Sequence, residues 1–377
     1  MIYLIPIILT LVGLHRYSTT DVRNRDNLYW IICLSIILIF GLRYRVGGDT
    51  IHYMQLYDAT PALGDGIWEY ALIYFKEPGI LFLFSAVKRF CDSFYIVQLC
   101  HVAFVNIVVF FFLKENTRNK YLSVLLYFFL FAFYYNTEII KESVALCFAL
   151  LGYRSLNNGK LIQYYLFAVA ALLFHVSALF LLFVPLLLKT KIKVVYLMIL
   201  FLVVSLFGNF ILSNVISLFG THIFDRIMYA SEYQLGNYGK WWNFMKTAVI
   251  VLYVYHLSVQ SKSTDQYNLK LLKLACAFGA LTISEYAGFY RILNYFYPIL
   301  IVCISNYLEN LKKSSSFSLN SIILAVMLFV FFMLPYLKDT SDKVPNTHYY
   351  CLWFPYYSIM DEQIDANREA FIIRNFE

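Results

Sequence analysis

The sequence predicts an all-α, polytopic integral membrane protein with about 12 transmembrane helices, within a range of roughly 10–13, some of them short or re-entrant. Three observations predict this class. The 377 residues are 61% hydrophobic and only 14% charged, whereas soluble domains carry about 25% charged residues. Twelve apolar stretches run through the chain, and a spanning helix needs about 20 apolar residues, or fewer where the bilayer is thin. No polar stretch between them is long enough for a soluble domain.

Each expected spanning segment is an apolar run bounded by polar or charged residues. The first, Met1–Leu14, has no charged start and no convincing cleavage site, so we expect a retained helix and not a signal peptide. The piece Gly79–Ala86 is too short to span and is expected to be re-entrant or interfacial. In chain order the spanning segments are 2–14, 28–42, 94–113, 121–135, 139–153, 161–174, 176–188, 194–212, 243–259, 271–287, 290–308 and 318–337.

The longest apolar run, Leu161–Leu188, has 28 residues and carries His175 near its middle. As one helix it would rise about 42 Å, which exceeds the hydrocarbon core of about 30 Å. We therefore expect two short helices that meet near His175. The whole of 1–337 is expected to form one transmembrane helical domain, followed by an extracytoplasmic tail at 338–377. Its main outer loops are 43–93, with short amphipathic or re-entrant helices, and 213–240.

The distribution of basic residues predicts that both termini lie outside. With that orientation the cytoplasmic loops hold 16 of the 30 basic residues but five of the 23 acidic ones, as the positive-inside rule requires. No basic run carries interleaved aromatics, so the net charge of +7 gives no sign of nucleic-acid binding. Ionisable residues near membrane depth are unfavourable and mark functional sites. Here they fall at outer helix ends: Arg43, Arg45, Asp49, Lys141, His175 and Arg291.

The first candidate site is the stretch Gly41-Leu-Arg-Tyr-Arg-Val-Gly-Gly-Asp-Thr-Ile-His-Tyr53. Arginine forks match phosphate oxygens, and backbone N–H groups near the paired glycines can add to an anion site. Alternatively, Arg43 and Arg45 anchor the chain at the membrane surface and Asp49 caps the next helix. The compact pattern favours a functional role.

Two further candidates lie at expected helix ends. Lys141 lies three residues from Glu138 in Asn136-Thr-Glu-Ile-Ile-Lys141, so it is either an anion-binding lysine or part of a helix start that neutralises itself. His175 is a candidate general base because the pKa of histidine lies near neutrality. Alternatively, it hydrogen-bonds a neighbouring helix at the break. Its position beside the other cations favours function.

The fourth candidate is Phe289-Tyr-Arg291-Ile-Leu-Asn294-Tyr-Phe-Tyr-Pro298. An arginine at the mouth of a helix, flanked by aromatic rings, suits a phosphate together with a sugar ring. Alternatively, Arg291 extends to the membrane interface, where Glu285 is close enough in sequence to neutralise it.

Several motifs of known chemistry are absent from the sequence. It contains no phosphate-binding loop ending in Gly-Lys-Ser/Thr, no HExxH, no Asp-x-Asp and no Gly-x-Ser-x-Gly. We therefore expect no cofactor, no bound metal ion and no ATP-driven transport.

The four stretches together resemble the EpsG family of bacterial exopolysaccharide proteins, which is related to the Wzy-type polysaccharide polymerases, over about residues 28–310. The Arg-x-Gly-x-Asp-x-x-x-Tyr stretch is matched by Arg45, Gly47 or Gly48, Asp49 and Tyr53. The Phe-His-x-Ser-Ala-Leu signature is matched by 174–179, and a later arginine motif resembles Tyr290-Arg291. The chain departs from the family's Ile-Arg-Gln helix start with Ile140-Lys141-Glu142, and lysine lacks the bidentate fork of arginine.

The resemblance implies a GT-C-like helical bundle in the bacterial plasma (inner) membrane, with its active site facing outward. It implies a polymerase that joins undecaprenyl-pyrophosphate-linked oligosaccharide repeat units during exopolysaccharide, capsule or O-antigen synthesis. Its implied partners are this lipid-linked oligosaccharide, the lipid bilayer, a chain-length regulator and other polysaccharide-assembly proteins. The implied roles are catalysis by His175 or Asp49, pyrophosphate binding by Arg43, Arg45, Lys141 and Arg291, and sugar binding by Tyr53 and Tyr290.

Two other functions stay open at this point. A polyprenyl-phosphate-sugar-dependent GT-C glycosyltransferase would use an acid of the first outer loop as its base, and Asp49 or Asp58 would serve. A non-enzymatic flippase for lipid-linked oligosaccharides would need cations in a cavity open to both sides, together with internal repeats. We find no internal repeat, and the clustering of charges on one side favours an enzyme.

Overall fold

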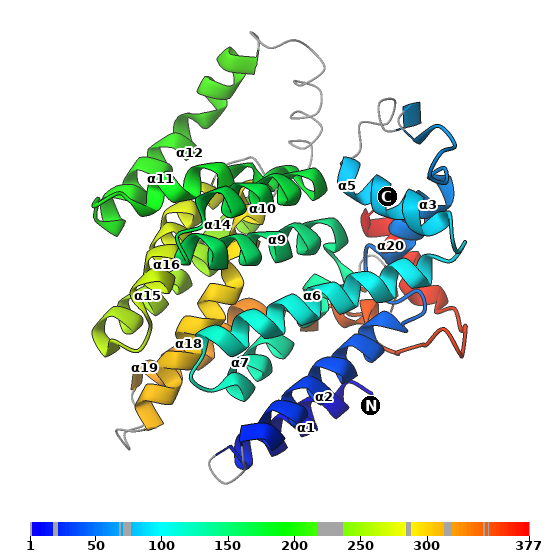
Figure 1. Ribbon diagram of the computed structural model, residues 1–377, viewed down its shortest axis with the longest axis horizontal. Coiled ribbons are helices and arrows are strands. Elements are labelled where there is room, and N and C mark those ends of the chain that lie inside the picture. The colour runs from blue at the N-terminus through cyan, green and yellow to red at the C-terminus, as the bar shows by residue number, and fades with distance from the viewer. Residues whose placement is uncertain are drawn as a thin grey trace. The chain divides into compact units, whose positions relative to one another are not determined.

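The computed structural model describes residues 2–17, 22–67, 69–70, 77–216, 237–283, 288–312, 319–341, 344–345 and 347–376. It is 79% helical, with no strand in these ranges, which confirms the predicted all-α class. Two compact units form, both traced in Figure 1. Unit 1 combines Met1–Val176 with Phe332–Glu377, and unit 2 is Ser177–Phe331.

Unit 1 is built from helices of the N-terminal half and from the C-terminal residues. The pairs α9–α10, α2–α6, α1–α2, α1–α7 and α5–α10 pack side by side. The helices of unit 1 are α1 (Leu4–His15), α2 (Val22–Gly41), α3 (Thr50–Ala59), α5 (Pro78–Lys88), α6 (Phe94–Asn116), α7 (Lys120–Tyr127), η1 (Phe128–Ala132), α8 (Phe133–Thr137), α9 (Ile140–Asn157), α10 (Leu161–Phe174), η7 (Leu334–Leu337), η8 (Tyr349–Leu352) and α20 (Ala366–Phe376).

Unit 2 packs α12 against α16 and η4, and α15 against α16 and α18. Its helix α16 begins where Asp265 Oδ1 accepts hydrogen bonds from the backbone N–H groups of Tyr267 and Asn268, at 2.9 and 3.0 Å, a typical N-cap. The helices of this region are η2 (Val176–Phe183), α11 (Val184–Leu188), α12 (Val194–Ile216), α14 (Asn237–Phe244), η3 (Met245–Val249), α15 (Ile250–Ser261), α16 (Gln266–Gly279), η4 (Ala280–Ile283), α17 (Gly288–Arg291), η5 (Ile292–Phe296), α18 (Tyr297–Lys312), α19 (Leu319–Leu328) and η6 (Phe329–Met333).

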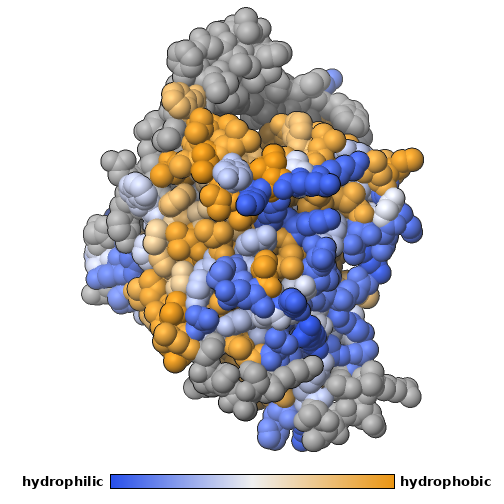
Figure 2. Space-filling view, turned by 90° about the vertical axis from the view of Figure 1, so that its left-hand side faces the viewer, coloured by the Kyte–Doolittle hydropathy of each residue, from blue (hydrophilic) through white to orange (hydrophobic). Residues whose placement is uncertain are grey.

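Large apolar side chains remain exposed on several helices, as expected where lipid replaces water. On α10 the exposed residues recur every three or four positions and form one stripe, whereas Ala168 and Ala171 on its other side are buried. Figure 2 shows apolar side chains over much of one face of the molecule. Such a surface is unfavourable in water and favourable against acyl chains. The stripe on α10 consists of Ile162, Leu166, Val169 and Leu173.

Three helices in the described ranges are long and apolar enough to cross a membrane: Phe94–Asn116, Ile292–Leu311 and Leu319–Leu337. Shorter apolar helices accompany them, so the count of about 12 spanning helices is not confirmed. The described parts of the predicted segments nevertheless fall mainly on helices. Segment 121–135, for example, is α7, η1 and α8 in succession. Most of the predicted outer loop 213–240, and also Glu285, lie outside the described residues.

The predicted break near His175 is confirmed. Helix α10 ends at Phe174, and His175 has the extended backbone angles φ −155° and ψ 129°. The chain then continues as the 3₁₀ helix η2 from Val176. The short apolar piece after Glu77 is also a helix of its own, the 11-residue α5.

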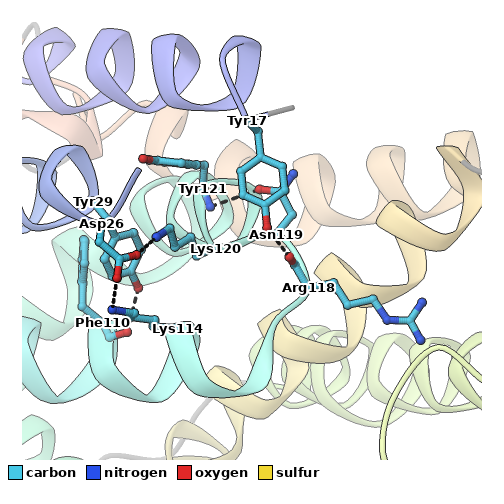
Figure 3. Close-up of polar contacts among 9 residues, drawn as sticks. All are labelled: Tyr17, Asp26, Tyr29, Phe110, Lys114, Arg118, Asn119, Lys120 and Tyr121. Atoms are coloured by element: carbon cyan, nitrogen blue, oxygen red, sulfur yellow. Dashed lines mark hydrogen bonds and ion pairs between the residues drawn. The ribbon is translucent and has the colours of Figure 1, made fainter. Parts of the chain in front are cut away.

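An ionic cluster joins α2, α6 and α7 at the ends that the sequence assigns to the cytoplasm (Figure 3). Lys114 Nζ donates to Asp26 Oδ2 at 2.7 Å, and Lys120 pairs with the other carboxylate oxygen. Beside them, Asn119 Oδ1 accepts from the N–H groups of Tyr121 and Leu122, each at 3.2 Å, and caps α7. The residues of the Arg43 stretch lie at the opposite end of α2. The sequence predicts that α2 and α6 cross the membrane in opposite directions. The contact between Asp26 near the start of α2 and Lys114 near the end of α6 agrees with this prediction.

The predicted orientation can be measured at Cys91, an exposed cysteine of the loop expected to be outside. In intact cells a membrane-impermeant maleimide is expected to label the wild-type protein more strongly than Cys91→Ala, which keeps the exposed Cys100 and the partly exposed Cys351. Introducing Asn158→Cys at an exposed position between α9 and α10, in the Cys91→Ala background, should add labelling only after permeabilisation. Added labelling of the Asn158→Cys protein in intact cells would contradict the orientation.

Candidate functional site

The guanidinium of Arg43 lies wholly inside unit 1. Its Nε donates to the Val46 carbonyl at 2.9 Å and its Nη1 to the Phe40 carbonyl at 2.5 Å. Its Nη2 has no hydrogen-bond partner among the described residues. Burial lowers the pKa of Arg43 to about 10, while the nearby phenol of Tyr3 and carboxyl of Glu138 act in the opposite direction. Arg43 is 0% exposed, so a ligand does not reach its guanidinium in this structure. Its hydrogen bonds instead hold the chain in place after α2.

The residues 42–49, here called the Arg–Gly loop, turn sharply at two positions. Arg45 has φ +50° and Gly47 has φ +109°, values in the left-handed region that favours glycine. A Cβ atom at position 47 would lie 2.6 Å from Thr137 Cβ, so the loop also needs the small size of glycine. The loop therefore approaches the end of α8 closely.

The backbone N–H groups of the paired glycines already have protein acceptors. Gly47 N–H donates to the Leu352 carbonyl at 2.9 Å, and Gly48 N–H donates to Glu138 Oε1 at 2.9 Å. Thr137 Oγ1 donates to the same carboxylate oxygen, also at 2.9 Å. Burial raises the pKa of Glu138, and these donors act against that rise. The prediction that these two amides are free to bind an anion is therefore wrong for this conformation.

Residues 338–376, here called the C-terminal segment, cover the Arg–Gly loop. Tyr44 N–H donates to the Tyr357 carbonyl at 2.8 Å, and Ile359 N–H donates to the Leu42 carbonyl at 2.9 Å. Arg45, whose side chain is 23% exposed, forms an ion pair with Glu369 on α20. That hydrogen bond raises the pKa of Arg45, so the guanidinium stays charged.

Two buried side chains hold the C-terminal segment in place. Trp353, 3% exposed, donates from Nε1 to Thr137 Oγ1 at 2.9 Å and contacts the ring of Phe133. Arg368, 1% exposed, donates from Nε to the Cys351 carbonyl at 2.8 Å and from Nη2 to the Pro355 carbonyl. Burial lowers the pKa of Arg368, so these carbonyl contacts compensate for lost hydration.

Asp49 and Tyr53 take up different environments on α3. Asp49 stands at the N-cap position, but its side chain makes no cap hydrogen bond, which contradicts the interpretation of Asp49 as a simple helix cap. It is half-buried. Tyr53 is 4% exposed and lies in a hydrophobic cluster with Leu56, Ile80 and Phe84. That burial favours packing over stacking of the Tyr53 ring on a sugar.

Lys141 forms an ion pair with Glu77, an acid that is not among the predicted site residues. Its Nζ donates to Glu77 Oε2 at 2.9 Å, and the two side chains are 22% and 24% exposed. The alternative interpretation, that Glu138 neutralises Lys141, is not what the structure shows: Lys141 pairs with Glu77, and Glu138 accepts from Gly48 and Thr137. A sequence signal existed for Glu77, since it directly precedes the Pro78–Gly79 start of a short apolar helix.

His175 belongs to the same neighbourhood as Glu77. It is 4% exposed, and its charge is among the causes that lower the pKa of Glu77. The helix ends explain this proximity, because a Cβ atom at Gly79 would lie 2.9 Å from the Leu173 carbonyl. The start of α5 therefore presses on the end of α10. Glu77, Lys141 and His175 are here called the charged cluster.

Arg291 and Tyr290 belong to unit 2, so the structure groups them apart from the other predicted site residues. Both are half-buried at the end of α17. Four residues later Tyr295 contacts the hydroxyl of Ser177, with an oxygen–oxygen distance of 3.0 Å, and the ring of Phe180. Within unit 2, the arginine stretch is thus tied to the second half of the Phe-His-x-Ser-Ala-Leu signature.

The matched family decides the class of protein. The EpsG family model matches residues 26–358. The chain belongs to the EpsG family. Membership indicates an exopolysaccharide-related, polymerase-like membrane protein. No curated protein and no solved structure matches the chain.

The matched range gives the site a boundary within this EpsG-family chain. It contains every predicted site residue, the charged cluster and the first part of the C-terminal segment, including Trp353. It ends before α20, so Arg368 and Glu369 lie beyond it. Among the described residues no group of three His, Cys, Asp or Glu side chains could hold a metal ion.

Trp353 tests whether the C-terminal segment supports the site of this EpsG-family protein. Trp353→Ala is expected to destabilise unit 1 by about 3–5 kcal/mol, the usual effect of removing a buried tryptophan. Trp353→Phe keeps most of the ring packing and loses only the bond to Thr137, so its effect should be about 1 kcal/mol. Thermal melting in detergent, followed by size-exclusion chromatography, measures both. Trp353→Ala melting like wild type would show that the segment is not part of the folded unit.

Proposed function

We propose that this chain is a polysaccharide polymerase that joins lipid-linked oligosaccharide repeat units at the outer face of the bacterial plasma membrane. Membership of the EpsG family supports this, together with one structural observation that carries the proposal. In unit 1, three helix ends bring the partly exposed ion pair of Glu77 and Lys141 close to the buried His175. Charged groups at helix ends in a membrane protein are kept where function needs them.

The proposed reaction joins two lipid-linked substrates. A hydroxyl oxygen of the acceptor repeat unit attacks the anomeric carbon at the reducing end of the donor glycan. The bond from that carbon to the phosphate oxygen breaks, and undecaprenyl pyrophosphate leaves with the electron pair. The leaving group is already activated in the substrate, so the reaction needs neither ATP nor a nucleotide sugar.

The predicted residues take roles that follow their environments. Arg45, partly exposed and charged, stabilises the negative charge that develops on the pyrophosphate. Arg291, in unit 2, stays a predicted pyrophosphate-binding residue. Arg43, being buried, holds the Arg–Gly loop in position for Arg45. The family resemblance assigns the general base to His175 or Asp49 and the sugar-stacking ring to Tyr290.

The chain lengths of the surface glycan test the proposed function. In the host, deletion of the gene is expected to abolish long surface glycans while single repeat units are still exported, and wild type is expected to restore them. His175→Ala or Arg291→Ala should lower polymerisation by at least about 100-fold, since acid–base and electrostatic groups contribute that much or more. A gel of the surface glycan resolves chain lengths.

The matched control is Arg89→Ala, an exposed arginine at the end of α5, which should restore normal chains. Normal chain lengths from well-expressed His175→Ala and Arg291→Ala would refute the site assignment. A deletion that exports no glycan at all would refute the polymerase and favour a flippase or an earlier transferase.

A further inference from the structure

Glu77 occupies an unusual position for an acid in an apolar chain. It is the N-cap residue of α5, followed by Pro78, and its side chain makes no cap hydrogen bond. Its Oε2 accepts the hydrogen bond from Lys141, and a carboxylate has about four acceptor positions on its two oxygens. The side chain is 24% exposed. The ion pair therefore leaves the carboxylate with acceptor capacity that a ligand can reach.

Three helix ends fix this position. Pro78 starts α5, and the absence of a side chain at Gly79 lets that start contact the carbonyl of Leu173 at the end of α10. Lys141 is the second residue of α9, which packs along α10. Helix α9 thus presents Lys141 to this carboxylate, and His175, the residue after α10, lies near enough to lower the pKa of Glu77. A charged group held from three elements keeps its geometry during a reaction.

The other acids near the Arg–Gly loop and α9 are less suited to accept a proton from a substrate. Glu138 is 8% exposed and already accepts from Gly48 and Thr137, and Glu142 is 1% exposed. His175 is 4% exposed. Asp49 is half-buried, but it lies on α3, outside the charged cluster. Glu77 and Glu369 both combine exposure with direct contact to a predicted site residue, but Glu369 lies beyond the range that the family model matches.

We propose that Glu77 is the catalytic base that takes the proton from the acceptor sugar hydroxyl. This inference rests on the proposed polymerase function and assigns the base to a residue that the family resemblance did not supply. As the hydroxyl oxygen bonds to the anomeric carbon, its proton moves to the carboxylate of Glu77. The carbon–oxygen bond to pyrophosphate breaks, and the lipid pyrophosphate leaves with the electron pair. Glu77 then returns the proton to water.

In this assignment Lys141 and His175 are positioning residues. Lys141 orients the carboxylate through the 2.9 Å contact and keeps it ionised. Its replacement by methionine keeps a similar length and removes the charge. If Lys141 had only a structural role, its replacement would change the amount of active protein and leave the pH profile unchanged.

The pH dependence follows from the groups that face Glu77. Burial raises its pKa, but the charge and hydrogen bond of Lys141, with a smaller contribution from His175, outweigh burial and hold the pKa below that of an ordinary glutamate. Helix α6 contributes the apolar Phe94 and Val97 to the packing of α5. A base must be deprotonated to act, so activity rises with pH through its pKa. Without Lys141 that pKa is higher, and the rise moves to higher pH.

The decisive experiment uses the full-length protein in proteoliposomes with the lipid-linked repeat units that accumulate in the deletion strain. Glu77→Gln is expected to lower the rate of chain growth by about 100-fold or more, within the range of general-base catalysis. Its melting temperature in detergent should stay near that of wild type, because glutamine has the same shape. Glu77→Asp should retain partial activity. The control Asp65→Asn, an exposed acid in the same predicted loop, should be fully active.

Each outcome decides between the proposals. Failure of wild type itself to lengthen the repeat units overturns the polymerase function. Wild-type activity in Glu77→Gln overturns the assignment of Glu77 and leaves the function standing. Should Glu77→Gln not fold, the folded Glu77→Asp and Lys141→Met proteins decide by their pH profiles. An acid limb of Lys141→Met that coincides with that of wild type contradicts the proposal.

Discussion

The buried guanidinium of Arg43 organises the polar end of unit 1. A charge without water around it is strongly unfavourable unless the protein supplies hydrogen bonds and an opposite charge. Here the carbonyls of Phe40 and Val46 accept its protons, and Glu138 lies within electrostatic range. Gln98 reinforces this arrangement by donating to the carbonyls of Gly41 and Arg43, at 2.8 and 2.9 Å. The end of α2 and the following loop therefore have one stable path.

That path is covered by residues about three hundred positions later in the chain. The loop supplies Val46 to a small hydrophobic core whose other buried members come from the C-terminal segment: Val344, Leu352, Trp353, Phe371 and Ile372. Backbone hydrogen bonds run alongside this core. Near a membrane surface, backbone groups must be paired or hydrated. The C-terminal segment is thus part of the folded unit. The ion pair of Arg45 with Glu369 is a further contact between this segment and the Arg–Gly loop.

This arrangement has a functional consequence for the arginine. An anion that approaches Arg45 meets a guanidinium already paired with a carboxylate. The pair holds the Arg45 side chain in place and keeps its guanidinium charged. Lys141 and Glu77 form an analogous pair at the start of α9. In both places the protein supplies a partner that keeps a charge stable when no substrate is bound.

The sequence by itself determined the class and much of the local structure. Low charge and repeated apolar runs leave only a helical membrane protein, because helices satisfy their own backbone hydrogen bonds. The break at His175 could be predicted because a 28-residue run is too long for one spanning helix. The EpsG resemblance was also visible in short motifs, and the matched family confirms it.

Only the tertiary structure decided which charges meet. Sequence spacing suggested that Lys141 pairs with Glu138, because the two are three residues apart. The helix starts at Ile140, however, so Glu138 lies before it and does not share a helical face with Lys141. Likewise, the residues around Arg43 do not indicate that Leu352, Trp353 and Arg368 contribute to the contacts that cover its loop. Such contacts join residues far apart in the chain, and local patterns carry no information about them.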